Sequence, residues 1–181
     1  MKRYLLPVLL LAAASIAGCG GPARQSAVSV QPVPAVSASV PAEREAVLTL
    51  YLPDADGMRL VRHDIPVRAR EKTLKNALFQ MIQLDRKAAY PILPTGLSVK
   101  NVTVSDGTAV INFSKELRKL SGGSTTETLF VSMVVNTATE FPNVKQVVFQ
   151  IEGQPLQKLT GHVDMTRPFK RDESMIRMEK K

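Results

Sequence analysis

The chain has 181 residues, a formal net charge of +8 from 24 Lys and Arg against 16 Asp and Glu, and one cysteine. A single cysteine excludes an internal disulfide and a zinc site built from several thiolates. The basic excess is compatible with an anionic lipid or wall polymer as a contact, an attraction that salt weakens. The length beyond the first fifty residues suits one domain with a core of its own.

The first eighteen residues predict a lipoprotein signal peptide. Lys2 and Arg3 precede an apolar stretch, Leu5–Ala17, which is shorter than the roughly 20 residues of a membrane-spanning helix. A basic start, a short apolar run and small residues at its end are typical of a secretory signal. The stretch "IAGC" resembles the lipobox of bacterial lipoproteins, which implies cleavage before Cys19 and a diacylglycerol group on its sulfur. An ordinary signal peptide with an incidental cysteine and a short membrane anchor are the alternatives.

Residues 19–46 are predicted to consist of the lipidated cysteine and a flexible linker. They are rich in Pro, Ala, Ser and Val and contain no aromatic residue, a composition that favours a linker over a core. Pro32, Pro34 and Pro41 cannot donate to a strand ladder, which argues against a buried strand. A flexible chain of this length spans roughly 30 Å. We therefore expect an exported protein that is lipid-anchored to the bacterial membrane and stands off its surface; Gly20 leaves inner or outer membrane open.

Residues 47–168 are predicted to form the folded domain. In two stretches of it the apolar residues recur with the period of a helix. In the stretch 71–86 the apolar positions three and four apart are Leu74, Ala77, Leu78, Met81 and Ile82. In the stretch 124–141 they are Leu129, Phe130, Met133 and Val134, with Thr137 on the same face. Ser124 followed by Glu127 predicts a capping box at the start of this second helix.

The strand predictions lie on both sides of these helices. A β-rich run at 47–51 comes before the first helix and is followed by a weaker strand between residues 58 and 67. Strands at 99–104 and 109–113 flank Asp106-Gly107, a strong hairpin signature, and residues 147–151 form the last run. The order predicts an α+β fold, a small mixed or antiparallel sheet with two helices packed on one face.

Few residues in the sequence indicate a catalytic or metal-binding site. Asp54 and Asp56 do not begin an EF-hand, because the twelfth residue from Asp54 is Ile65 instead of the closing Glu. His63 and His162 show no metal-ligand spacing, and surface or turn histidines are expected. "SGGS" at 121–124 lacks the Lys of a phosphate loop and is interpreted as a loop and cap. No catalytic residue, metal or cofactor is therefore predicted, and Cys19 is the one site residue, for lipid attachment.

These segments resemble the GerMN domain of bacterial sporulation and germination lipoproteins. The resemblance runs from about Leu48 to Phe169, and its marks are "LTLYLPDADGMRLV", "DGTAVINFS", "GGS" followed by Glu127, "TEFPNV" and "GHVDMTRPF". It implies an envelope lipoprotein without catalytic residues. Sporulation members of the family resemble the ring-building modules of secretion machines, small α+β domains that associate side by side. This chain has one copy followed by a basic tail, 169–181.

The leading hypothesis is a non-enzymatic interaction module tethered by lipid, with envelope proteins or another copy of itself as partners and no nucleic acid. The tail beginning at Arg167 carries six bases against three acids and is expected either to be solvated or to contact an anionic surface. The alternative is a protein that binds or hydrolyses peptidoglycan, including spore cortex. Hydrolysis would need converging carboxylates, and the candidates are Asp54, Asp56, Asp64 and Glu116.

Overall fold

The computed structural model describes residues 44–177. The predicted signal peptide, Cys19 and all but the end of the predicted linker lie outside these residues. In chain order the elements are β1 (Glu45–Pro53), β2 (Leu60–Arg68), η1 (Ala69–Glu71), α1 (Leu74–Asp85), β3 (Val99–Ser105), β4 (Thr108–Phe113), η2 (Lys115–Lys119), α2 (Gly123–Ala138), β5 (Gln146–Ile151), β6 (Gln154–Pro155), β7 (Phe169–Lys170) and η3 (Glu173–Met175). None of the helices in 44–177 has the length and apolar content needed to cross a bilayer.

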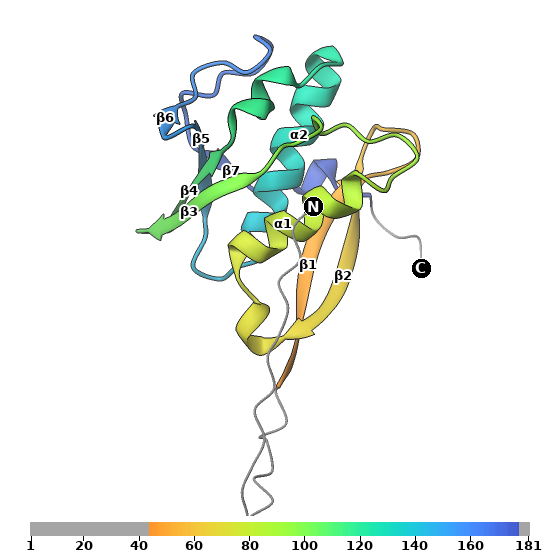
Figure 1. Ribbon diagram of the computed structural model, residues 1–181, viewed down its shortest axis with the longest axis vertical. Helices are drawn as coiled ribbons and strands as arrows, with labels where there is room; N and C mark the ends of the chain where they lie inside the picture. The colour runs from red at the N-terminus through yellow and green to blue at the C-terminus, as the bar shows by residue number, and fades with distance from the viewer. Residues whose placement is uncertain (1–43, 178–181) are drawn as a thin grey trace, which may run out of the picture. The chain divides into compact units, whose positions relative to one another are not determined.

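The strands form two sheets with the helices between them (Figure 1). Strands β1 and β2 make an antiparallel pair, and the second sheet has the order β3-β4-β5-β6 with β7 also paired to β5. Strands β3 and β4 are antiparallel, whereas β4 and β5 are parallel, so α2 is the crossover between them. The α+β class, the two helices and the mixed strand directions are confirmed. The strands are divided between two sheets.

Helix α2 explains this division, because its later part, 129–138, is buried on every side. All ten residues from Leu129 to Ala138 are buried, polar ones included. A helix of this kind needs cover on more than one face. On one side the Tyr51 amide of β1 donates to Thr137 Oγ1 at 3.1 Å. On the other, the Phe130 ring lies 5.7 Å from that of Phe149 in β5.

Helix α1 and the β3–β4 hairpin agree closely with the predictions made from the sequence. All five apolar residues predicted for the face of α1 are buried. Asp106 and Gly107 both have positive φ, 51° and 76°, as a two-residue type I′ turn requires. The strand β3 carries one irregularity, a register shift between Val99 and Asn101. The extra residue changes the phase of the strand, so that Val99 and Val102 both pack against the core.

The start of α2 differs from the predicted capping box. The N-cap residue is Gly122, which has φ 112° and makes no side-chain cap hydrogen bond. Glu127 is fully buried and accepts hydrogen bonds from the Thr160 amide at 3.2 Å, the Thr160 hydroxyl and the His162 amide at 3.1 Å. The capping-box prediction is therefore wrong, because Glu127 is used to bind the loop 157–165.

Gly122 is the position in the loop 121–124 where a side chain is expected to be most harmful. A Cβ built there would lie 2.2 Å from Thr126 Oγ1, whereas one at Gly123 would meet nothing within 4 Å. We expect Gly122→Ala to lower the free energy of unfolding by about 1.5 kcal/mol, more than Gly123→Ala does. Urea unfolding of both variants measures the difference, and equal losses would contradict the steric argument.

The folded part also extends beyond residue 168, into the predicted basic tail. Residues 169–177, here called the C-terminal strap, pack on the domain. The Phe169 ring lies edge-on to Phe149 at 5.6 Å. The Asn136 side chain binds both backbone groups of Asp172, accepting from its amide at 3.0 Å and donating to its carbonyl at 3.1 Å. The Arg177 amide donates to the Leu60 carbonyl at 2.7 Å. Two basic side chains of the strap also contact the domain, Arg171 at the Asn136 carbonyl and Arg177 at Asp54.

Candidate functional site

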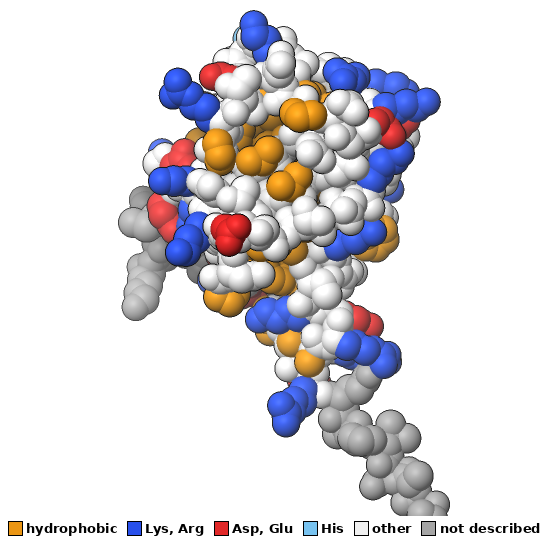
Figure 2. Space-filling view, turned by 90° about the vertical axis from the view of Figure 1, so that its left-hand side faces the viewer, with side chains coloured by type: hydrophobic (Ala, Val, Ile, Leu, Met, Phe, Trp, Pro, Cys, Tyr) orange, Lys and Arg blue, Asp and Glu red, His pale blue; other side chains and the backbone are white. Residues whose placement is uncertain are grey.

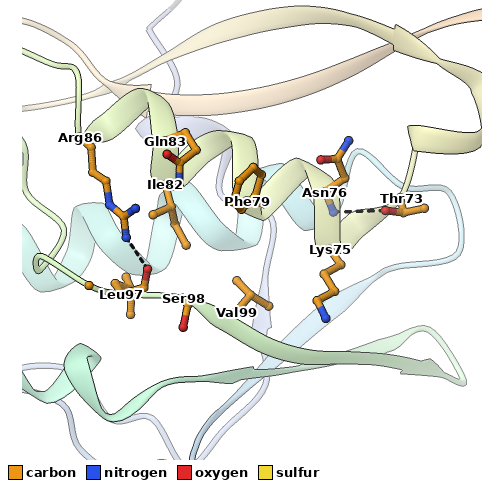
Figure 3. A pocket seen from close by; sticks show the side chains of 11 residues that line it. Thr73, Lys75, Asn76, Phe79, Ile82, Gln83, Arg86, Leu97, Ser98 and Val99 are labelled. Carbon is orange, nitrogen blue, oxygen red and sulfur yellow. Dashed lines mark hydrogen bonds between the residues drawn. The ribbon is translucent and has the colours of Figure 1, made fainter. Parts of the chain in front are cut away.

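A groove between α1 and the beginning of β3 is the candidate site (Figure 3). Its volume is about 610 Å³. Apolar side chains form much of its surface, with polar and basic ones among them: Thr73, Lys75, Asn76, Phe79, Ile82, Gln83, Arg86, Leu97, Ser98 and Val99, together with Gly96.

The local sequence builds this groove. Thr73 caps α1 by accepting a hydrogen bond from the Asn76 amide at 3.2 Å, so the helix begins at one end of the groove. Phe79 lies off the buried stripe of α1 and is 53 % exposed. It lines the groove and lies midway along the helix in Figure 3. An exposed aromatic ring in a groove is typical of a contact surface.

Basic side chains at the two ends of α1 donate hydrogen bonds to the segment 97–100, which forms the opposite wall of the groove. The Lys75 ammonium donates to the Lys100 carbonyl at 3.2 Å, and the Arg86 guanidinium donates to the Leu97 carbonyl at 2.7 Å (Figure 3). Within residues 44–177 neither cation forms an ion pair with a carboxylate. The groove therefore presents positive charge at both ends.

One wall of the groove continues into a free strand edge. In the described residues β3 pairs only with β4. Apart from β4, no backbone group in 44–177 bonds to the segment 101–105. Val104 in this segment is 36 % exposed. An unpaired edge beside an apolar groove can accept another strand.

The four candidate carboxylates do not meet at this groove or at any other single place. Asp54 and Asp56 line a second cleft of about 640 Å³ with His63 and Tyr90. Asp64 lies with Arg171 at a third. Glu116 lines none of these, and a Cβ built at Gly96 of the first groove would lie 3.4 Å from Glu116 Cγ.

Hydrogen bonds hold three of these carboxylates in their ionised forms. Burial opposes ionisation of Asp54, but the amides of Met58 and Arg59 outweigh it and lower the pKa of Asp54. Its Oδ2 is buried without a hydrogen bond and lies 3.3 Å from the Arg177 guanidinium. The Thr49 hydroxyl lowers the pKa of Asp64.

A hydrogen bond also favours the ionised form of Glu116. The Ser114 hydroxyl lowers the pKa of Glu116. A glycosidase general acid needs the opposite, a carboxyl group whose pKa is raised. Burial does raise the pKa of Asp85, which borders the second cleft, but the amides of Ile92 and Leu93 occupy its oxygens.

The histidines lie apart from each other. His63 is in β2, and the His162 amide binds Glu127 in the loop 157–165. No group of three His, Cys, Asp or Glu in the described part of the chain could hold a metal ion. The groove between α1 and β3 was missed by the sequence reasoning. The one local signal in the sequence that could have indicated this groove is Phe79, an aromatic residue that lies off the apolar face of its helix.

Basic side chains are also prominent on the neighbouring surface. Figure 2 shows the side on which the sheet β3-β4-β5 lies in Figure 1. Hydrophobic side chains gather near the middle of this face, and Lys and Arg surround them more densely than Asp and Glu do. This distribution agrees with the formal charge of +8.

Solved structures share this fold. The first GerMN domain of the sporulation protein GerM from Bacillus subtilis is 26 % identical with a TM-score of 0.56, and the match covers 71 % of this chain and 98 % of that one. The tandem GerMN domains of the same protein are 24 % identical with a TM-score of 0.59, covering 70 % of this chain and 46 % of that one. None of the curated proteins compared with the chain matches it. The chain thus has the α+β fold of a GerMN domain.

The family follows from the sequence match. The family model Germane, described as sporulation and spore germination, matches residues 49–157. The chain belongs to this family. The resemblance to GerMN proteins is confirmed, and the match includes α1, β3 and therefore the groove between them.

Proposed function

We propose that this chain is an exported, non-enzymatic interaction module that holds a partner protein in the envelope during sporulation or germination. Its family and its GerMN fold support a role in that process. The stretch 16–19, which resembles a lipobox, supports a tether to the membrane through Cys19. The diacylglycerol group would provide the two acyl chains that stable anchoring needs.

The observation that carries the proposal is the groove between α1 and β3. It combines the half-exposed Phe79 ring with a strand edge that no other strand of the described residues covers. Buried aromatic anchors and main-chain pairing are two common ways in which proteins bind peptide segments. The four candidate carboxylates are divided among separate places on the domain, which supports binding over acid-catalysed hydrolysis.

Photo-cross-linking of the full chain in the cells that produce it tests this function. A photoreactive amino acid replaces Phe79, and in a matched variant it replaces Tyr90, which is 83 % exposed in the second cleft. We expect Phe79 to capture an envelope protein and Tyr90 to capture none. Cys19→Ser is expected to remove both the membrane association and the Phe79 cross-link.

Two outcomes would contradict the proposal. Capture of wall material at Tyr90 with none of any protein at Phe79 would favour the peptidoglycan alternative. Absence of cross-links at both positions, with the lipidated protein present at normal levels, would overturn the interaction function.

A further inference from the structure

We propose that the end of the β1–β2 hairpin next to residue 44 contacts the membrane through anionic phospholipid headgroups. This end, here called the tether end, consists of residues 44–47 and 66–72, which cover the start of β1, the end of β2 and η1. The inference rests on the lipid tether of the proposed function and adds a second membrane contact to it. It does not involve the groove between α1 and β3.

The place where the tether joins the domain selects the membrane as the contact. Residues 20–43 separate the predicted lipidated Cys19 from Arg44, the first described residue. A flexible linker of this length keeps the tether end within roughly 30 Å of the bilayer. Such a tether gives an effective concentration of about a millimolar. A weak attraction is therefore sufficient to bring this end to the membrane surface.

The tether end projects from the rest of the domain. Strands β1 and β2 pair along their whole length, and the Ala69 amide donates to the Arg44 carbonyl at 2.8 Å. Arg44 is thereby held beside η1. In Figure 1 this end of the hairpin extends below the helices and the second sheet. It can reach a flat surface without hindrance from those elements.

Exposed bases outnumber exposed acids at the tether end. The bases are Arg44, Arg68, Arg70 and Lys72, and the acids are Glu45 and Glu71. The Arg68 amide donates to the Glu71 carboxylate at 3.2 Å, so Glu71 also stabilises the turn into η1. A surplus of two positive charges favours contact with an anionic membrane roughly tenfold or more, and salt weakens the attraction.

Apolar groups beside these charges suit the same surface. Val47 is 46 % exposed, and Pro66, which lies opposite it in the strand register, is exposed as well. Basic residues combined with exposed apolar groups are typical of protein surfaces that lie in the membrane interface. In Figure 2 Lys, Arg and hydrophobic side chains lie close together at the lower end of the domain.

The other end of the hairpin has the opposite charge. The turn 54–57 contains Asp54 and Asp56 and no base, and both carboxylates lie near Arg177 of the C-terminal strap. An anionic membrane attracts cations and repels carboxylates. The hairpin should therefore stand with its tether end on the membrane and its turn away from it, which orients the whole domain.

Photo-cross-linking of the full lipidated chain in vesicles tests the inference. A photoreactive amino acid replaces Val47, and in the matched variant it replaces Met58, which is 67 % exposed just after the turn 54–57. The vesicles contain phosphatidylcholine alone or with phosphatidylglycerol. We expect phosphatidylglycerol to raise phospholipid capture at Val47 at least fivefold, and Met58 to capture little in either vesicle. Equal capture at both positions, or no effect of phosphatidylglycerol at Val47, would overturn the inference.

Charge-reversal variants locate the effect. Arg44→Glu with Lys72→Glu turns the surplus of two positive charges into a deficit of two and should reduce capture at Val47 at least tenfold. Lys72→Glu alone serves if the double variant unfolds. Arg118→Glu with Lys119→Glu is the control, since it changes the net charge equally at exposed residues of η2, and should leave capture within twofold. An equal effect of the control would overturn the inference.

Separate observations test this inference and the proposed function. Membrane association that depends on Cys19, without phospholipid capture at Val47, would leave the proposed function intact and overturn the contact at the tether end. Protein capture at Phe79 tests the groove whatever Val47 captures. In cells, capture of a wall polymer or a protein at Val47 in place of phospholipid would overturn the inference. A chain that carries no lipid would overturn both the tether and this contact.

Discussion

Glu127→Ala is expected to lower the free energy of unfolding by about 3 kcal/mol. The carboxylate is fully buried and accepts hydrogen bonds from the Thr160 amide, the Thr160 hydroxyl and the His162 amide. Alanine would leave these donors without their acceptor and create a small cavity. The loop 157–165, which also places Met165 in the core, should exchange its amide hydrogens faster than in the wild type.

The stability provided by Glu127 should depend on pH in a defined direction. Burial opposes ionisation, but the Thr160 and His162 donors outweigh it and lower the pKa of Glu127 below its usual 4.5. A carboxyl group with a lowered folded-state pKa contributes its stability above the unfolded pKa and loses it as the pH falls through the folded value. The difference between wild type and Glu127→Gln should therefore be largest above about pH 5 and shrink in more acidic solution.

Urea unfolding at several pH values, with hydrogen exchange of residues 157–165, measures both effects. Asp164→Ala is the matched control, because Asp164 lies in the same loop but is exposed and bonds only to Thr166. A loss for Asp164→Ala as large as that for Glu127→Ala would show that loop composition, and not the buried acceptor, determines stability.

Arg171→Ala is expected to lower the free energy of unfolding by about 2 to 3 kcal/mol. The guanidinium donates to the Tyr51 hydroxyl at 2.8 Å and to the Asn136 carbonyl at 3.1 Å, and it lies 3.0 Å from Glu140. It also stacks over the Tyr51 ring at 5.3 Å. These contacts join the C-terminal strap to β1 and to the end of α2, so alanine should release the strap.

Arg62→Ala is the control for Arg171→Ala. Arg62 pairs with Asp64 at 3.1 Å, but both side chains are about half exposed, and exposed pairs contribute about 0.5 kcal/mol. Denaturant unfolding of the two variants, with proteolysis at residues 169–177, measures the contrast. Equal and small losses would contradict a structural role for the strap.

Patterns contained in short stretches were sufficient for much of the fold. The apolar spacing in residues 71–86 predicted the buried face of α1, and Asp106-Gly107 predicted the hairpin between β3 and β4, both confirmed. The motifs from Leu48 to Phe169 predicted the family, which the Germane match confirms. Cys19 remains a prediction, because it lies outside the described residues.

The roles of individual side chains in tertiary contacts could not be predicted in this way. The spacing of Ser124 and Glu127 fits a capping box, yet Glu127 binds residues 33 and 35 positions later. Arg171 fits a basic tail, yet it binds Tyr51, 120 residues earlier. Nothing within a few residues of Glu127 or Arg171 specifies these partners.

The sequence by itself determined the α+β class, the places of the two helices and the hairpin, and the resemblance to the GerMN family. These depend on the periods of helices and strands and on turn chemistry, which act over a few residues. Only the tertiary structure decided the division into two sheets, the strap and the groove between α1 and β3. Those features arise where segments far apart in the chain pack together, and their geometry depends on side-chain contacts that no local period encodes.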